Sequence, residues 1–236
     1  ENLVVSGYDF TKFPIGTRFT CKDVVLELTQ IGKECHHGCE IFQKMGECIM
    51  PTNGVFAKVL HGGKISVGDE FHVQYRAAVI TLSDTASKGE REDASGAAVE
   101  EIVGKEGYEV VFKKIIPDDG DTLTALLCEL SDEDKADLIL TTGGTGFSKR
   151  DNTPEATMRA VERETPGISE AMRYYSLQIT PRAMLSRGVS GIRKEALIVN
   201  LPGSPKAVRE CLEYAIGALT HGIDILKGNT GHCAGK

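Results

Sequence analysis

The sequence of 236 residues contains no tryptophan, and aromatic residues make up only 6% of it. No apolar stretch approaches the ~20 residues that a membrane-spanning helix needs, and the first residues lack a signal-peptide pattern. The formal net charge of −7 argues against a protein that coats nucleic acid or binds a membrane surface. Seven cysteines at irregular spacing argue against a secreted disulfide framework, so we expect reduced thiols and a cytoplasmic location.

The pattern of the chain changes near residue 75. Residues 1–75 contain short apolar runs (18–21, 24–28, 55–60 and 70–73) between glycine-containing turns, which predict a small, incomplete all-β, barrel-like region. Residues 76–228 alternate between strand and helix patterns, which predicts an α/β domain with a parallel sheet flanked by helices. We expect a flexible tail at 229–236. The chain begins at Glu1 without an initiator methionine, which suggests an N-terminal truncation.

The α/β region is expected to contain four strands and four helices. The predicted strands are 77–82, 108–116, 138–142 and 196–200, and the predicted helices are 95–103, 122–130, 154–164 and 205–219.

Residues 138–157 carry the most informative pattern, which reads as an apolar strand, a glycine-rich loop and a helix. Thr153 is predicted as the N-cap and Pro154 as the first helical residue. The free N–H groups and the dipole of such a helix end favour an anion, and Lys149 and Arg150 add positive charge. Asp151 does not suit a pure anion site, and it indicates a metal ion or the orientation of a reacting group. The alternative is a plain strand-to-helix turn, and neither the P-loop nor the dinucleotide fingerprint fits.

Polar residues follow all four predicted strands. Ser83 and Asp84 follow the first strand, Asp118 follows the second, and the glycine loop follows the third. Residues 200–206 follow the fourth, with Ser204 as the predicted N-cap of the next helix. Because ligands of parallel sheets bind at the carboxyl ends of strands, we expect one shared crevice.

That crevice suits a nucleoside triphosphate. Asp118 and Asp151 could hold Mg²⁺ between phosphate oxygens, with Lys206 offsetting charge. Asp119 or, preferably, Asp121 is expected to cap the helix from residue 122.

Four segments together resemble one family. They are Thr142-Gly-Gly-Thr-Gly with Arg150-Asp-x-Thr-Pro-Glu-Ala-Thr157, Ile116-Pro-Asp118, Ala183-Met-Leu-Ser-Arg-Gly188 and Leu201-Pro-Gly-Ser-Pro-Lys206. Over residues 76–228 the chain resembles the molybdopterin adenylyltransferases, which include MogA-like and MoaB-like proteins and the gephyrin G domain. The resemblance implies a three-layer α/β fold, a homotrimer, and transfer of AMP from Mg-ATP to molybdopterin with release of pyrophosphate. It also suggests a molybdenum-insertion protein as a partner.

The resemblance assigns roles to particular residues. Asp118 and Asp151 match the functional, metal-associated pair. The implied ligand-binding residues are Ser83, Asp84, Gly143, Gly144, Thr145, Gly146, Arg150, Thr153, Pro154, Glu155, Ser186, Arg187, Pro202, Gly203, Ser204 and Lys206. Two alternatives stay open: a non-catalytic molybdopterin carrier or scaffold, and a nucleotide hydrolase of the competence-damage-protein type.

The first region is similar to the C-terminal part of a MOSC domain, a barrel linked to molybdenum-cofactor sulfur chemistry. The segments are Gly32-Lys-Glu-Cys-His36, Gly46-Glu-Cys-Ile-Met-Pro51, Gly54-Val-Phe-Ala-Lys-Val59 and Ser66-Val-Gly-Asp-Glu70. The resemblance makes Cys35 the candidate functional cysteine, with Cys48 second, for cofactor binding or sulfur handling. Read from the residues alone, Cys35, Cys39 and Cys48 could also bind zinc, carry a reactive thiolate or be inert.

Overall fold

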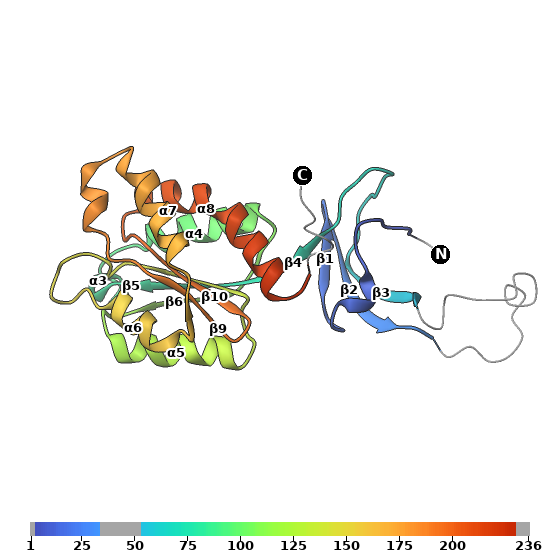
Figure 1. The fold of residues 1–236 in the computed structure, drawn as a ribbon, viewed down its shortest axis with the longest axis horizontal. Helices are drawn as coiled ribbons and strands as arrows, with labels where there is room; N and C mark the ends of the chain where they lie inside the picture. Colours follow the sequence, from blue (N-terminus) through green and yellow to red (C-terminus); the bar gives the residue numbers. More distant parts are fainter. Residues whose placement is uncertain (1–2, 34–52, 230–236) are drawn as a thin grey trace, which may run out of the picture. The chain divides into compact units, whose positions relative to one another are not determined.

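The computed structural model describes residues 3–33 and 53–229. These residues form two compact units, one from the described residues up to Gln74 and the other from Tyr75 to Gly228. Figure 1 shows both units along the chain. Each unit has its own sheet and its own buried core.

The N-terminal unit is a four-stranded antiparallel sheet in the order β3-β2-β1-β4. Its elements are the short 3₁₀ helix η1 (Phe10–Lys12), β1 (Arg18–Cys21), β2 (Val24–Ile31), β3 (Val55–His61) and β4 (His72–Gln74). Phe13, Phe19 and Phe71 form its core with Cys21 and Leu28. Within the described residues the sheet is open, with β3 and β4 at its edges. The predicted incomplete barrel is therefore an open sheet in this part of the chain.

The second unit is built on a six-stranded sheet in the order β6-β5-β7-β10-β9-β8. Its strands are β5 (Arg76–Leu82), β6 (Glu109–Ile116), β7 (Leu138–Thr142), β8 (Arg163–Glu164), β9 (Ser190–Arg193) and β10 (Ala196–Leu201). The first four strands in this spatial order are parallel, whereas β9 runs antiparallel to both of its neighbours.

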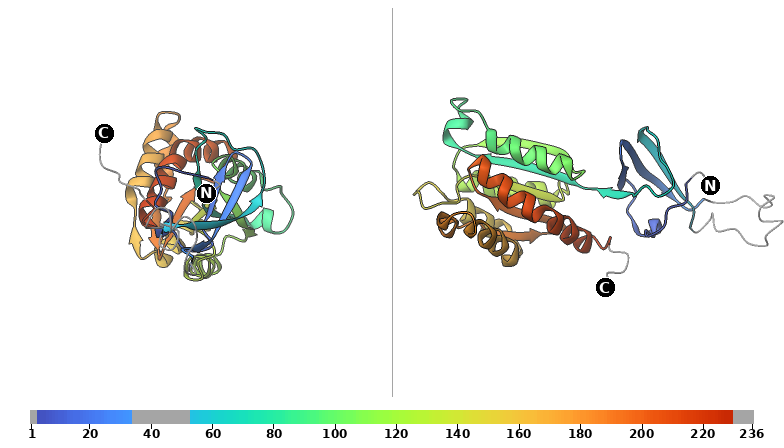
Figure 2. Two further views of the ribbon diagram at one scale, coloured as in Figure 1. Left: turned by 90° about the vertical axis from the view of Figure 1, so that its right-hand side faces the viewer. Right: turned by 90° about the horizontal axis from the view of Figure 1, so that it is seen from above.

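Helices cover both faces of this sheet. They are α3 (Asp84–Ser87), α4 (Ala94–Lys105), α5 (Gly120–Asp132), α6 (Thr153–Ala160), α7 (Pro166–Leu177), the 3₁₀ helix η2 (Pro181–Leu185) and α8 (Pro205–Leu226). Figures 1 and 2 show α4, α7 and α8 over one face, and Figure 1 shows α5 and α6 over the other. Strands β7 and β10 are buried along their whole length, as strands between two helical layers must be. The three-layer α/β prediction is confirmed.

The expected helix at 154–164 is wrong at its C-terminal end. Helix α6 stops at Ala160, and Arg163 and Glu164 instead form β8, which pairs with β9. The local pattern of Glu162-Arg163-Glu164 favours a helix, but the pairing with β9 makes Arg163 and Glu164 a strand. Because β9 is distant in sequence, the local pattern could not indicate this pairing. The sequence pattern also indicates no element where α3, α7, η2 and β9 lie.

Candidate active site

A cavity of about 240 Å³ lies at the carboxyl ends of the parallel strands. Gly144 and Gly203 line it together with Asp118 and Asp151. The full lining is Thr81, Leu82, Ser83, Ala86, Arg91, Glu92, Asp93, Ala94, Ser95, Asp118, Thr142, Gly143, Gly144, Asp151, Gly203 and Pro205. The expectation that the two loops and the two aspartates share one hollow is therefore met, while their roles in ligand binding stay predictions.

Glycine is required in the β7–α6 loop because the backbone there is left-handed and crowded. Gly143 has φ +99°, and a Cβ atom would lie 2.3 Å from the carbonyl oxygen of Leu82. Gly144 has φ +62°, and its Cβ would lie 2.4 Å from the Thr153 hydroxyl. A Cβ on Gly203 would lie 3.2 Å from the Gly143 Cα, so the two loops meet almost backbone to backbone.

The carbonyl oxygens of the glycine loop all accept hydrogen bonds from the protein. Thr153 donates its hydroxyl to the Gly143 oxygen and its N–H to the Gly144 oxygen, at 2.9 and 3.2 Å. Arg187 donates its N–H to the Thr145 oxygen and its Nε to the Gly146 oxygen, at 2.9 and 2.7 Å. The loop therefore presents no unsatisfied acceptor at these four positions.

The N–H groups of the same loop behave differently. Among the described residues, no acceptor takes a hydrogen bond from the N–H of Gly144, Thr145 or Gly146. A row of free donors with satisfied carbonyls is the arrangement that binds an anion, because each N–H carries a partial positive charge.

The carbonyl oxygens of the β10–α8 loop are also satisfied by the protein. The Thr142 hydroxyl donates to the Pro202 oxygen at 2.7 Å, and the Ser95 hydroxyl donates to the Gly203 oxygen at 2.7 Å. Ser95 comes from the first turn of α4, so this bond joins α4 to the β10–α8 loop at the wall of the cavity.

The predicted N-caps need correction. Thr153 lies inside α6, whose N-cap is Asn152, because the Thr153 hydroxyl binds the Gly143 oxygen instead of a helix N–H. Ser204 is the N-cap residue of α8, but its side chain makes no capping bond. Asp119 caps α5 by accepting the Thr122 N–H at 3.0 Å, whereas Asp121 pairs with Arg159. The first turns of α6 and α8 therefore carry no side-chain cap.

Asp118 and Asp84 are held close together at the ends of β6 and β5. Asp118 accepts the Asp84 N–H at 3.2 Å, and Asp84 accepts the Asp118 N–H at 3.1 Å. Burial, with the negative charges of Asp84 and Asp151, raises the pKa of Asp118 above its ordinary value despite the hydrogen bond from Asp84 and the charge of Arg150. Burial thus disfavours the charged form of Asp118 relative to an exposed carboxylate.

Most cations assigned to the site already have partners. Arg150 binds Asp84, with Nε and Oδ2 2.8 Å apart, and Lys206 lies 3.7 Å from Glu210. Arg187 pairs with Glu155. Arg91, which no sequence pattern singled out, lines the cavity without an ion pair to any described residue. Lys149 is exposed and does not line the cavity.

Six of the predicted site residues line the cavity: Ser83, Asp118, Gly143, Gly144, Asp151 and Gly203. The others lie outside the lining: Asp84, Thr145, Gly146, Arg150, Thr153, Pro154, Glu155, Ser186, Arg187, Pro202, Ser204 and Lys206. Cys35 and the zinc hypothesis fall outside the described residues.

One wall of the cavity had no predicted role. It is the segment from Arg91 to Ser95 at the start of α4. Asp93 caps α4 through the Gly96 N–H at 2.8 Å and accepts the Thr81 hydroxyl at 2.8 Å. The aspartate before the expected helix start was the available signal for the cap, but nothing local pointed to the cavity.

The family described as "probable molybdopterin binding domain" matches residues 78–221, which include the glycine loop, both aspartates and the β10–α8 loop. The chain belongs to this family. The MOSC domain model matches residues 1–72, ahead of the molybdopterin-binding domain.

Curated relatives match the same part of the chain. The molybdopterin adenylyltransferase of Helicobacter pylori (strain ATCC 700392 / 26695) is 43% identical over 153 residues, which cover 64% of this chain and 87% of that protein. The enzyme of the same name from Escherichia coli (strain K12) is 44% identical over 155 residues, which cover 63% of this chain and 79% of that protein.

Solved structures match the molybdopterin-binding domain as well. The molybdopterin biosynthesis enzyme MoaB from Thermus thermophilus has a TM-score of 0.63 and 42% identity, and the match covers 66% of this chain and 98% of that one. The tungsten cofactor synthesizing protein MoaB from Pyrococcus furiosus has a TM-score of 0.60 and 34% identity, with coverages of 65% and 98%. Among the described residues, no helix is long and apolar enough to cross a membrane.

Proposed function

We propose that the molybdopterin-binding domain adenylylates molybdopterin, using ATP and releasing pyrophosphate. The observation that carries the proposal is a cavity lined by Gly144, whose loop offers free N–H groups, and by the two carboxylates of Asp118 and Asp151. The names of the relatives that are 43 and 44% identical support the same reaction. Nucleotidyl transfer needs alignment and charge stabilisation more than a protein nucleophile, and this cavity supplies both.

The donor set suits Mg²⁺. The Oδ1 atoms of Asp118 and Asp151 accept no hydrogen bond from any described residue, whereas each Oδ2 accepts one backbone N–H. No cluster of three metal-binding side chains exists among the described residues, so an all-protein cage is absent there. Mg²⁺ prefers one or two carboxylates completed by water and phosphate oxygens. When bound, it would neutralise charge on the phosphates undergoing transfer.

The protein's own groups then have distinct tasks. The N–H of Gly144 at the cavity, and those of Thr145 and Gly146 where the loop continues beyond its lining, bind phosphate oxygens and fix the chain of phosphates relative to the strand ends. Asp118 and Asp151 would hold the divalent cation, each from the loop that follows its strand. Arg91 adds a positive charge at the α4 wall, where it stabilises charge that builds on the transferred group.

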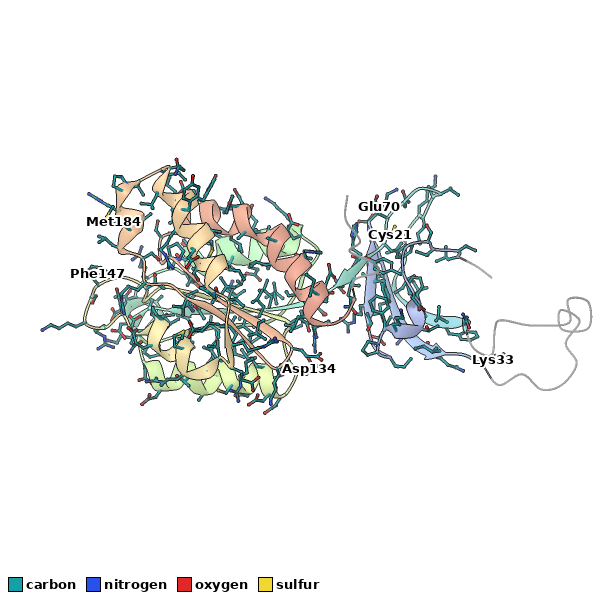
Figure 3. All side chains as sticks on the ribbon, in the orientation of Figure 1. Cys21, Lys33, Glu70, Asp134, Phe147 and Met184 are labelled. Atoms are coloured by element: carbon teal, nitrogen blue, oxygen red, sulfur yellow. The ribbon has the colours of Figure 1, made fainter. Side chains whose placement is uncertain are left out.

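The test is to mix the full-length protein with molybdopterin, ATP and Mg²⁺, and to measure both pyrophosphate and the mass of the pterin product. We expect stoichiometric pyrophosphate and a product heavier by one adenylyl group. Asp151→Asn should abolish both signals. Asp134→Asn, at the opposite end of the unit from Phe147 in Figure 3, should leave them unchanged.

A pterin product without added mass, together with tight molybdopterin binding, would contradict catalysis and favour the carrier function. Release of phosphate or AMP without pterin would favour the hydrolase.

For the N-terminal unit we propose cofactor binding or sulfur handling, supported by the MOSC match over residues 1–72. Cys35 as its functional cysteine, a homotrimeric assembly, a molybdenum-insertion partner and a cytoplasmic location stay predictions.

A further inference from the structure

We propose that Arg187 is a positioning residue that fixes Asp151 and the glycine loop, and that it does not bind the substrate phosphate. This inference rests on the proposed function of the cavity and deepens it. It reassigns a side chain for which the resemblance implies ligand binding.

The guanidinium of Arg187 joins the two ends of the loop between Gly146 and Asp151. Its Nε donates to the backbone carbonyl oxygen of Gly146 at 2.7 Å, and one terminal nitrogen donates to the backbone carbonyl oxygen of Asp151 at 2.6 Å. The other terminal nitrogen binds the carboxylate of Glu155 in the first turn of α6. One rigid, planar group therefore fixes the spacing between the glycine loop, Asp151 and α6.

The bonds of Arg187 leave it poorly suited to reach a ligand. All three of its side-chain nitrogens have protein partners, and its backbone N–H binds the Thr145 oxygen. Only 32% of its side chain is exposed, against 62% for Arg150, and it does not line the cavity. A phosphate would have to break several charge-assisted bonds to recruit it.

The partner of Arg187 in α6 is held in its charged form. Burial acts to raise the pKa of Glu155, but its own backbone N–H and the Arg187 guanidinium more than offset that, so the pKa lies below its ordinary value. The ion pair therefore persists at neutral pH.

The carboxylate of Asp151 depends on this arrangement for its place. A Cβ on Gly146 would lie 2.8 Å from Asp151 Oδ2, so the carboxylate lies directly over the Gly146 Cα. The Ser148 N–H donates to the same oxygen at 3.2 Å. Arg187 binds the backbone carbonyls of both Gly146 and Asp151. It therefore fixes where the Asp151 backbone lies relative to the glycine loop, and so where the Asp151 carboxylate lies at the cavity.

Loss of Arg187 should act through the loop. The carbonyls of Gly146 and Asp151 would lose their charged donor, and each could rotate and bring a partial negative charge toward the free N–H groups. Loss of a group that orients a metal ligand typically costs about 10–100-fold in metal affinity or activity. A lysine cannot replace the fork, since one ammonium does not span two carbonyls and a carboxylate in fixed geometry.

The experiment compares Arg187→Gln, Arg187→Lys and a matched control, Arg193→Gln, in the full-length protein. Arg193 binds the Asp132 carboxylate and the Ala160 oxygen, so its loss removes the same kinds of bonds away from the cavity. The measurements are amide hydrogen exchange without ligand, Mn²⁺ binding in the presence of ATP by electron paramagnetic resonance, and the steady-state constants kcat and KM for molybdopterin.

We expect both Arg187 variants to exchange amides of residues 144–151 faster than wild type, with β7 and β10 unchanged. Mn²⁺ affinity and kcat should each fall about 10–100-fold, while KM for molybdopterin changes by less than about threefold. Arg193→Gln should match wild type in all three. A large rise in KM with unchanged kcat and Mn²⁺ affinity would overturn the proposal, because it would make Arg187 a direct ligand.

The failure of the two proposals can be told apart. If wild type makes no adenylylated product, the proposed function fails, and hydrogen exchange and Mn²⁺ binding still report on Arg187. If wild type is active and Arg187→Gln shows unchanged exchange, Mn²⁺ affinity and kcat, only the positioning role fails.

Discussion

Asp118 and Asp84 each accept a hydrogen bond from the other's backbone N–H, at 3.2 and 3.1 Å. This reciprocal pair joins the carboxyl ends of β5 and β6 and brings the Asp84 carboxylate beside Asp118, which lines the cavity. Arg150 pairs with Asp84, whereas Asp118 has no ion pair within the described residues. Asp118 therefore carries a charge that the ligand-free fold does not fully compensate.

The first prediction is that Asp118→Asn stabilises the ligand-free protein while it abolishes adenylyl transfer. The raised pKa of Asp118, caused mainly by burial, means that its charged form weakens the fold at neutral pH. The amide removes that charge and keeps an oxygen for the Asp84 N–H. We expect the melting temperature to rise by no more than about 2–4 °C, which corresponds to about 1 kcal/mol for a protein of this size, because solvent screens this partly exposed carboxylate.

Thermal melting without Mg²⁺ and nucleotide measures the first effect, and pyrophosphate release measures the second. Turnover should fall by more than about 100-fold, because Asp118 is proposed to bind the metal directly and even outer partners of metal ligands typically contribute about 10–100-fold. A variant that melts lower than wild type, or that retains most of its turnover, would contradict the role given to Asp118.

The second prediction concerns the left-handed backbone of the glycine loop. Gly143→Ala should destabilise the protein by about 1–3 kcal/mol and weaken ATP binding, because the new Cβ meets the Leu82 oxygen. Urea unfolding and isothermal titration with Mg-ATP measure the two effects. The matched control is Gly104→Ala within α4, where a Cβ meets nothing within 4 Å. It should stabilise the protein by about 0.5–1 kcal/mol. If Gly143→Ala and Gly104→Ala change stability and ATP binding equally, the backbone at Gly143 does not require glycine.

The third prediction concerns Asp137, which is 3% exposed. It accepts the Arg76 N–H at 2.7 Å, and its Oδ1 lies 2.7 Å from both the Arg76 guanidinium and Lys227 Nζ. Asp137 therefore ties the start of β5 to the end of α8. Asp137→Asn should cost about 3–5 kcal/mol of unfolding free energy, because it leaves two cations without their buried partner.

Asp134→Asn is the control for that measurement. Asp134 also pairs with Arg76, at 2.8 Å, but its side chain is 70% exposed. Its loss should cost no more than about 1 kcal/mol in urea unfolding. If the two variants lose similar stability, the buried cluster does not hold the unit together.

The same cluster predicts a pH dependence. Burial acts to raise the pKa of Asp137, but hydrogen bonds from Arg76 and Lys227 more than offset it, so the pKa lies below its ordinary value. A lowered folded pKa stabilises the fold above the unfolded pKa of about 3.9, and that stability is lost as the pH falls through the folded pKa. Below about pH 4, wild type should therefore lose stability more steeply than Asp137→Asn in urea unfolding. If the stability of wild type and of Asp137→Asn falls equally with pH, the pKa of Asp137 is the same in the folded and the unfolded state.

The sequence predicted the centre of the sheet and the convergence of its loops well. The strand expected at 138–142 is β7 at Leu138–Thr142, because a continuous apolar run ends at an unmistakable glycine loop. The meeting of Gly144 and Gly203 in one cavity followed from the parallel order of β7 and β10.

Other features depended on contacts between distant segments. Residues 162–164 read locally as helix, but pairing with β9 makes Arg163 and Glu164 a strand. Thr153 has the right residue type for an N-cap, yet its hydroxyl is taken by the Gly143 oxygen. The bonds of Arg187 to Gly146 and Asp151 span 41 and 36 residues of sequence, and no local pattern encodes them.

The most direct test of the central claim is a crystal structure of the full-length protein with Mg²⁺ and a non-hydrolysable ATP analogue. Phosphate oxygens should lie about 3 Å from the N–H groups of Gly144, Thr145 and Gly146, with the metal between Asp118 and Asp151. Phosphates bound outside the cavity, or inside it without contact to this loop, would contradict the account.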